Sequence, residues 1–218
     1  MRLTRFIACA ACLLAVLAAA AAQADPLRAL TFIEVRSHAT ERSGPVLRRY
    51  EQTVGGHSVL VLEETARPER FALLETAPAS DATADRDAAQ LSGNLSELLT
   101  APLDRRTHRE FGEPARAPAA TPAALYVITH LDIAPPERGK GETALQHLAE
   151  QARHSAGNLR FEVWQQTDRS NHFNLIAAWR SREDFNNFAA SAAAREFRTS
   201  VASLLGSPYD ERFYRRAD

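Results

Sequence analysis

Alternating side chains mark two short segments of the second half of the chain, Leu125–Asp132 and Leu159–Gln166. This period of two predicts two β-strands. A third strand is expected over Phe173–Trp179, a mainly apolar segment. Asp168-Arg169-Ser170-Asn171 is a typical turn sequence, so the last two strands are expected to form a hairpin.

Two further segments show helical spacing. Over residues 142–155, leucine and alanine side chains recur three or four residues apart, and Gly157 follows as a stop signal. Ser181, with Asp184 three residues later, predicts the start of a second helix. That helix is expected to run to about Leu205.

The first half of the chain repeats the second. Residues 98–106 (LLTAPLDRR) return as residues 204–212 (LLGSPYDER), so both copies keep the same proline, aspartate and arginine positions. Upstream, matching positions from Gly55 to Leu73 return 102 residues later, from Gly157 to Leu175. A period of this length indicates a duplicated domain rather than a solenoid of short repeats.

A last strand over residues 211–215 completes the second copy. Its order is then strand, helix, strand, strand, helix, strand, which is that of a ferredoxin-like unit. The first copy follows the same order, although the loop and helix between residues 39 and 54 are expected to be about ten residues shorter. Its expected strands and second helix lie at residues 30–38, 57–64, 71–75, 80–99 (the helix) and 103–111.

The helices of such a unit cover only one face of its sheet, so the other face needs a partner. Two copies in one chain can cover each other. We therefore predict an α+β fold in which two ferredoxin-like repeats pack sheet to sheet within one chain. The expected divisions are a first repeat at 25–112, a Pro/Ala-rich linker at 113–123 and a second repeat at 124–218.

Residues 1–24 are predicted to be a secretory signal peptide. Arg2 and Arg5 precede an uncharged run from Phe6 to Ala22, and Ala22-Gln23-Ala24 has the small residues of a cleavage site. An uncleaved anchor is the alternative, but a membrane span needs ~20 residues. Cleavage after Ala24 predicts a periplasmic or secreted protein with no remaining membrane span.

Cleavage also changes which chemistry is available. Cys9 and Cys12 are both removed, which excludes disulfides, a cysteine nucleophile and Cys-ligated metals. The loss of Arg2 and Arg5 takes the formal net charge from -1 to -3, and such a mixed surface does not indicate a nucleic-acid partner. Zinc spacings, Gly-rich phosphate loops and a Ser-His-Asp pattern are absent from the sequence, so no metal site is predicted.

Three blocks of the second copy carry a family resemblance. They are residues 157–163 (GNLRFEV), 173–181 (FNLIAAWRS) and 185–191 (FNNFAAS), followed by Phe197. In order and spacing they resemble the antibiotic biosynthesis monooxygenase (ABM) family, within the dimeric α+β barrel superfamily. Members of that family pair as homodimers. The resemblance therefore implies that the tandem chain mimics one dimer, as a pseudo-dimeric monomer or a dimer of barrels.

The resemblance also implies a chemistry. The family includes cofactor-free oxygenases of phenols and quinols and haem-degrading oxygenases, both with a pocket between sheet and helices. A small aromatic or quinone-like molecule, O₂ and no cofactor are therefore expected. The chain departs from the pattern at Phe188, where a His is usual, and at Ala177, where an acid is common. Phe197 and Arg198 occupy the region of the haem degraders' iron-ligating His.

His130 is the candidate catalytic base, because the resemblance places it at a pocket position and a neutral imidazole can take a phenol proton. The alternative is a buried histidine bonded to a backbone carbonyl. Arg160 either binds an anion or pairs with Glu162, and Trp179 is assigned to the core. The candidate substrate-binding residues are Tyr126, Asn158, Arg160, Trp164, Phe185, Phe188 and Phe197.

Two functions remain open at this point. The first is an exported, cofactor-independent monooxygenase of a small phenolic or quinol-like compound. The second is a non-catalytic periplasmic module that binds an aromatic or haem-like small molecule. In either case the site is expected within residues 124–215, with the first copy as scaffold.

Overall fold

Both halves of the chain run through the same order of strands and helices. The structure, a computed structural model, describes residues 26–55, 58–77, 82–113 and 125–217. The first repeat contains β1 (Leu27–Glu34), α1 (Thr40–Thr53), β2 (Ser58–Glu64), β3 (Arg70–Ala77), α2 (Ala82–Leu95) and β4 (Asp104–Glu110). The second contains β5 (Leu125–Asp132), α3 (Arg138–Arg153), β6 (Asn158–Gln166), β7 (His172–Trp179), α4 (Arg182–Ala189), α5 (Ala192–Ala202) and β8 (Asp210–Arg216).

The strands close into one barrel in the order β1-β3-β2-β8-β5-β7-β6-β4. The last strand of each repeat joins the two halves. β4 pairs with β1 and with β6, and β8 pairs with β5 and with β2, all antiparallel. The prediction of two ferredoxin-like repeats packed within one chain is confirmed, and every strand of the barrel has a partner on both sides.

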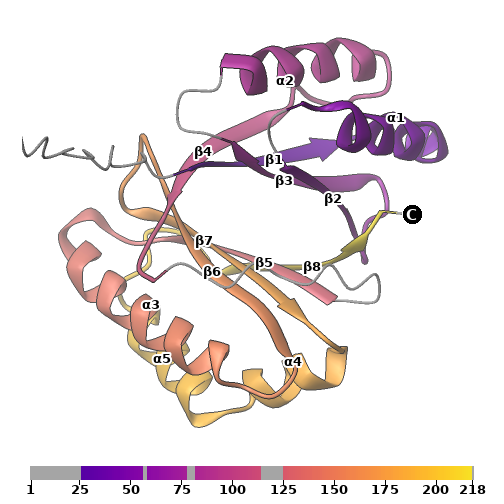
Figure 1. Cartoon of the computed structure of the whole chain (residues 1–218). Coiled ribbons are helices and arrows are strands. Elements are labelled where there is room, and N and C mark those ends of the chain that lie inside the picture. The colour runs from indigo at the N-terminus through magenta and orange to yellow at the C-terminus, as the bar shows by residue number, and fades with distance from the viewer. Residues whose placement is uncertain (1–25, 56–57, 78–81, 114–124, 218) are drawn as a thin grey trace, which may run out of the picture.

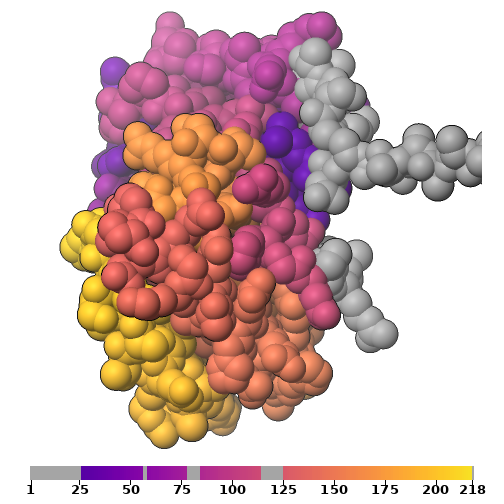
Figure 2. Space-filling view, turned by 90° about the vertical axis from the view of Figure 1, so that its left-hand side faces the viewer, coloured from indigo at the N-terminus to yellow at the C-terminus, as the bar shows by residue number. Residues whose placement is uncertain are grey.

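Two layers of helices enclose this barrel. α1 and α2 lie over the strands of the first repeat, and α3, α4 and α5 lie over those of the second (Figure 1). In the space-filling view the repeats meet in one continuous body (Figure 2). Along β3, Phe71 and Leu73 join the core under the helices, whereas Ala72 and Leu74 join the core inside the barrel. Both faces of the sheet are therefore buried.

The barrel interior also holds charged side chains, and several of them form ion pairs. Arg160 donates two hydrogen bonds to Glu162, at 2.9 and 2.7 Å, and Nε1 of Trp164 donates a third to the same carboxylate at 2.7 Å. Arg28 donates to Glu110 at 2.7 Å. A buried charge is tolerated when it is paired in this way.

Two local predictions were wrong. The first repeat does not lack ten residues around α1, because β1 and β2 begin at 27 and 58 and β5 and β6 at 125 and 158. Only Ser43, Leu47 and Tyr50 of α1 are buried, so its helical period is weak in the sequence. The helix predicted to reach Leu205 is two helices, because the Ser191 side chain accepts a hydrogen bond from the Ala194 backbone and begins α5.

The predicted signal peptide and nearly all of the predicted linker lie outside the described residues. Within the described part of the chain, no helix is long and apolar enough to cross a membrane.

Gly157 fixes the connection between α3 and β6. Its φ is +77°, a conformation that favours glycine. A Cβ added there would lie 2.2 Å from Cγ of Asp184. Asp184 has little room to move, because it donates its backbone N–H to Ser181 at the start of α4 and accepts from the Ser181 hydroxyl.

We expect Gly157→Ala to lower the free energy of unfolding by about 1–3 kcal/mol, through backbone strain and this clash. Chemical denaturation would measure the loss. The matched control is Gly55→Ala at the equivalent position of the first repeat, where an added Cβ meets no described atom within 4 Å. Equal losses for the two variants would contradict this account.

Candidate functional site

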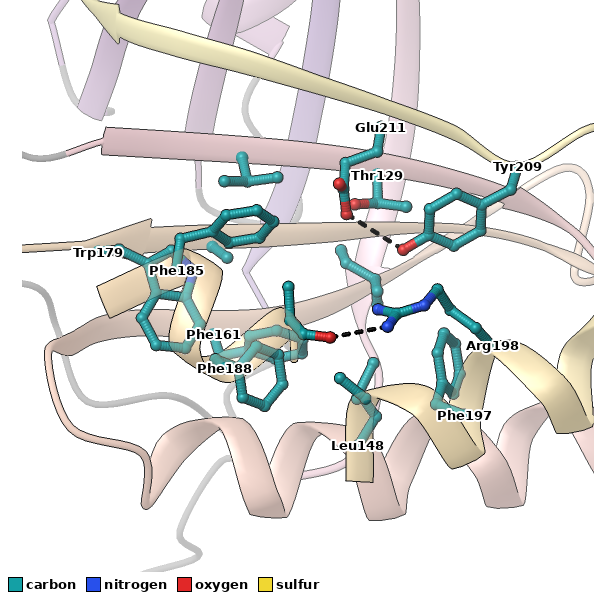
Figure 3. Close-up of a pocket in the computed structure, with 15 residues that line it drawn as sticks. Thr129, Leu148, Phe161, Trp179, Phe185, Phe188, Phe197, Arg198, Tyr209 and Glu211 are labelled. Atoms are coloured by element: carbon teal, nitrogen blue, oxygen red, sulfur yellow. Dashed lines mark hydrogen bonds between the residues drawn. The ribbon is translucent and has the colours of Figure 1, made fainter. Parts of the chain in front are cut away.

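A narrow cavity lies in the second repeat between the outer face of the sheet and α3, α4 and α5 (Figure 3). We call it the outer cavity. Its volume is about 30 Å³, which is room for water but not for an aromatic ring. The side chains that line it include Val127, Thr129, Leu148, Phe161, Leu175, Ala177, Trp179, Phe185, Phe188, Phe197, Arg198, Tyr209 and Glu211.

Aromatic side chains form one end of the outer cavity. Phe188 of α4 stacks on Trp179 of β7 with ring centroids 4.9 Å apart, and it meets Phe161 edge to face at 6.2 Å. The strand period points Phe161 and Trp179 toward the helices, and the helical period points Phe188 back at them. Nε1 of Trp179 is buried without a hydrogen-bond partner among the described residues. It is a donor that a ligand oxygen would satisfy.

Polar side chains form the other end. Tyr209 donates its hydroxyl to Glu211 at 3.2 Å, and Thr129 lies directly opposite Glu211 in the pairing of β5 with β8 (Figure 3). Burial raises the pKa of the Glu211 carboxyl above its usual value, while the Tyr209 hydrogen bond and Arg198 act in the opposite direction. Burial and the Glu211 charge together raise the pKa of Tyr209.

This end can therefore exchange a proton. A carboxylate of raised pKa is a stronger base than an exposed one, and it lies beside an apolar surface suited to an aromatic ring. Among the described residues there is no group of three or more His, Cys, Asp or Glu side chains that could hold a metal ion.

Arg198 closes the outer cavity. It reaches from α5 to the carboxyl end of α4 and donates to the Ala189 carbonyl at 2.7 Å (Figure 3). Both residues line the cavity. Only Ala190 and Ser191 connect α4 to α5. A rotation of α4 against α5 about this connection would widen the outer cavity.

The second repeat matches a known protein family. The family model "antibiotic biosynthesis monooxygenase" matches residues 124–200. Residues 124–200 therefore belong to the ABM family. None of the curated proteins compared with the chain matches its sequence.

Solved structures extend the likeness to both repeats, at the level of fold. A candidate monooxygenase from Fusobacterium nucleatum has a TM-score of 0.77 at 10% identity, covering 89% of this chain and 94% of its own. A second from Lactobacillus acidophilus has a TM-score of 0.70 at 10% identity, covering 89% and 95%. An anthrone oxidase-like protein has a TM-score of 0.67 at 10% identity, covering 90% and 93%. All three span the whole barrel rather than the ABM domain alone.

Three of the residues proposed from sequence line the outer cavity of the ABM domain, namely Phe185, Phe188 and Phe197. Trp179, which was assigned to the core, lines it as well. The departures noted above, Phe188 and Ala177, therefore lie in the wall of this cavity.

The other proposed residues lie elsewhere. Tyr126 and Trp164 belong to the core inside the barrel, and Arg160 pairs with Glu162 there, which settles the choice left open for that arginine. Asn158 begins β6 and donates to the Arg160 carbonyl. His130 faces the barrel interior with Tyr126, because the outer cavity takes the alternate residues of β5, Val127 and Thr129.

The sequence reading missed Tyr209, Glu211 and Arg198 as polar groups of the ABM domain's site. One signal was present. In a strand over residues 211–215, Glu211 shares a face with Phe213, so an acid stands on the side that packs against helices. This pattern identifies Glu211 as a cavity residue only when it is known which face of the strand the helices cover.

We expect Glu211→Gln to raise the melting temperature more at pH 8 than at pH 4. Because the pKa is raised on folding, the folded state holds a proton that the unfolded state has already lost, so stability falls as pH rises through the folded pKa. The glutamine side chain cannot ionise, so the stability of the variant does not fall with pH in this way. Thermal melts at both pH values would measure the difference.

Glu150→Gln on the exposed face of α3 is the matched control, and its effect should not differ between the two pH values in this way. If Glu211→Gln shifted the melting temperature equally at pH 4 and pH 8, the assignment of a raised pKa to Glu211 would be wrong.

Proposed function

We propose that the chain is an exported, cofactor-independent monooxygenase that oxidises a small phenolic or quinol-like compound with O₂ in the outer cavity. The observation that carries the proposal is Glu211, a partly buried carboxylate of raised pKa at the end of a cavity walled by aromatic rings. The ABM family match supports the class of chemistry. The proposed base is thus Glu211 rather than His130, which lies on the other face of β5.

In this proposal the substrate supplies its own electrons. The Glu211 carboxylate takes a proton from the substrate, and the substrate anion passes one electron to O₂. The substrate radical and superoxide combine to a peroxide anion at carbon, Glu211 returns its proton to give the hydroperoxide, and the hydroperoxide loses water. A ring CH of the phenol (CH₂ in its keto form) thus becomes C=O, one oxygen atom of O₂ enters the product, and the other leaves as water.

Two donors of the cavity suit the anionic stage. The Trp179 Nε1–H is buried beside the aromatic end, and the Arg198 guanidinium lies at the polar end. Fixed donors of this kind stabilise a developing oxyanion without reorganising. Substrate entry requires the joint between α4 and α5 to move, because a volume of 30 Å³ does not admit a ring.

A binding module without turnover is the second candidate. The observation in its favour is the pair of apolar side chains, Phe188 and Ala177, in the cavity wall at the positions where the resemblance predicts a His and an acid. A phenol would then stabilise the protein against heat without any O₂ uptake. Haem is a poorer ligand for this cavity, since Phe197 and Arg198 stand where the haem degraders' iron ligand would lie.

We also propose export by residues 1–24 and a single-chain barrel, alone or as a dimer of barrels. The closed order of the strands supports the second point, because both repeats are needed to close the barrel. Mature protein starting at Asp25 should therefore behave as a compact particle in solution scattering. An extended, two-lobed particle would contradict the intramolecular pairing.

The catalytic test is O₂ uptake by the mature protein with a panel of hydroquinones and anthrone-type compounds. We expect uptake above the protein-free rate, reduced by about 10²–10⁴-fold in Glu211→Gln, because the general base is lost. Glu150→Gln, on the exposed side of α3, is the control for the change of charge.

His130→Ala serves as the competing arm of this test. Loss of uptake in His130→Ala with full uptake in Glu211→Gln would move the base to His130. Equal uptake with and without protein would exclude the catalytic form of the proposal, and thermal stabilisation by the same compounds would then support the binding module.

A further inference from the structure

The aspartate and arginine positions shared by the two repeated segments lie at one end of the barrel, and the proposed function does not use them. In the first repeat Asp104 lies opposite Phe32 of β1, and in the second Asp210 lies opposite His130 of β5. β1 and β5 are equivalent strands on opposite sides of the barrel order. The two copies therefore bring equivalent residues to one end of the barrel, about an approximate twofold axis.

A second cavity opens at this end, and we call it the barrel-mouth cavity. Its volume is about 380 Å³, which is within the range of small-molecule sites. Both repeats line it. Its lining includes Phe32, Arg70, Arg106, His130, Arg212 and Tyr214.

The charges of the barrel-mouth cavity are layered. Three arginines pair with three carboxylates, so the lining is neutral in total, but in every pair the arginine is the more buried partner. The exposed side-chain fractions are 32% for Arg106 against 49% for Asp104, and 34% for Arg212 against 44% for Asp210. They are 25% for Arg70 against 45% for Glu34. In these three ion pairs the arginines thus lie deeper than the carboxylates, although buried Glu64 adds one further acid beside Arg212 and Tyr214.

The guanidinium groups of Arg106 and Arg212 are each held in place by an aspartate. Each aspartate accepts from Nε and Nη2 of its arginine, at 2.9 and 2.6 Å for Arg106 and at 3.1 and 2.6 Å for Arg212. This leaves Nη1 outside both ion pairs. Both groups also lie within 6 Å of the Phe32 ring, with Cζ at 5.9 and 5.7 Å from its centroid.

Arg70 adds a further donor to the same wall. Its Nε is buried and has no hydrogen-bond partner among the described residues. A buried donor left in this state costs free energy, and an anion in the cavity would recover it.

His130 supplies the acceptor on the opposite side. Asn174 is fully buried and donates its amide to Nε2 of His108 at 2.8 Å, so its oxygen faces Nδ1 of His130 at 3.3 Å. His130 must then carry its proton on Nδ1, which leaves the lone pair on Nε2. Burial lowers the pKa of His130, and it lowers that of His108 to about 4, so both rings are neutral at pH 7.

We infer that the barrel-mouth cavity is a second binding site, separate from the outer cavity, for a small aromatic hydroxycarboxylate. The carboxylate would lie against the inner arginines, because planar guanidinium donors match its geometry. The ring would contact Phe32 and Tyr214, and the hydroxyl would donate to Nε2 of His130. Phe32 and His130 occupy equivalent positions of the two repeats. Because they differ, one side of the site is apolar and the other has a hydrogen-bond acceptor.

The probe is 4-hydroxybenzoate, titrated into the mature protein by calorimetry. We expect Arg106→Gln and Arg212→Gln each to weaken binding by about tenfold or more. Arg109→Gln is the matched control. Arg109 lies on β4, as Arg106 does, but its side chain donates hydrogen bonds to Gln165 on the outer side of the sheet. Benzoate should bind more weakly than 4-hydroxybenzoate, and His130→Ala should abolish that preference.

The site can be located without catalysis. On titration the Arg106 and Arg212 side-chain NMR signals should shift, while the indole N–H of Trp179, which reports the outer cavity, should not. Arg106→Lys and Arg212→Lys keep the charge and should still weaken binding, which covers the case that the glutamine variants do not fold.

Three outcomes would overturn the inference: no binding at millimolar concentration, binding that the arginine variants do not change, or a shift confined to Trp179. None of these depends on O₂ uptake. The proposed oxygenase activity and this second site can therefore fail separately.

Discussion

The rest of the structure depends on the pairing of strands between the two repeats. Each repeat has one bare sheet face and exposed strand edges, which would otherwise meet solvent or another chain. The two strand pairings between the repeats, β2 with β8 and β4 with β6, are short. Leu62–Glu64 pairs with Tyr214–Arg216, and His108–Glu110 pairs with Trp164–Gln166. Side chains reinforce them, as where Arg215 pairs with Glu63 at 2.9 Å and the hydroxyls of Thr107 and Thr167 lie 2.6 Å apart.

Closure of the barrel separates the molecule into two kinds of space. The outer faces of the strands pack on helices and leave the outer cavity. The inner faces enclose the barrel interior, where Glu162 accepts hydrogen bonds from Arg160 and Trp164 of the same strand. Alternate residues of one strand therefore serve different sites. Thr129 lines the outer cavity, and the next residue, His130, lines the barrel-mouth cavity.

Duplication within one chain also lets the two halves differ. At the positions of Tyr209 and Glu211 the first repeat has Leu103 and Arg105. Arg105 is taken up by ion pairs with Glu75 at 3.2 Å and Asp85 at 2.9 Å. The Tyr209–Glu211 pair of the outer cavity thus has no counterpart in the first repeat, whereas a homodimer would carry the same residues twice.

The sequence by itself determined the repeat, the order of the elements and the fold class. Alternation marks a strand whatever it packs against, and a duplicated order of elements with bare faces leaves few ways to cover them. The Phe185, Phe188 and Phe197 stripe was readable for the same reason, because a helix on a sheet has one buried face. Only the tertiary structure decided which face of each strand meets the helices. Most residues of β5 are buried on both faces, so alternation carries no sign of inside or outside there. That is why His130 was read into the helix pocket, and why the roles of Glu211 and of the repeated Asp-Arg pairs emerged only once the barrel had closed.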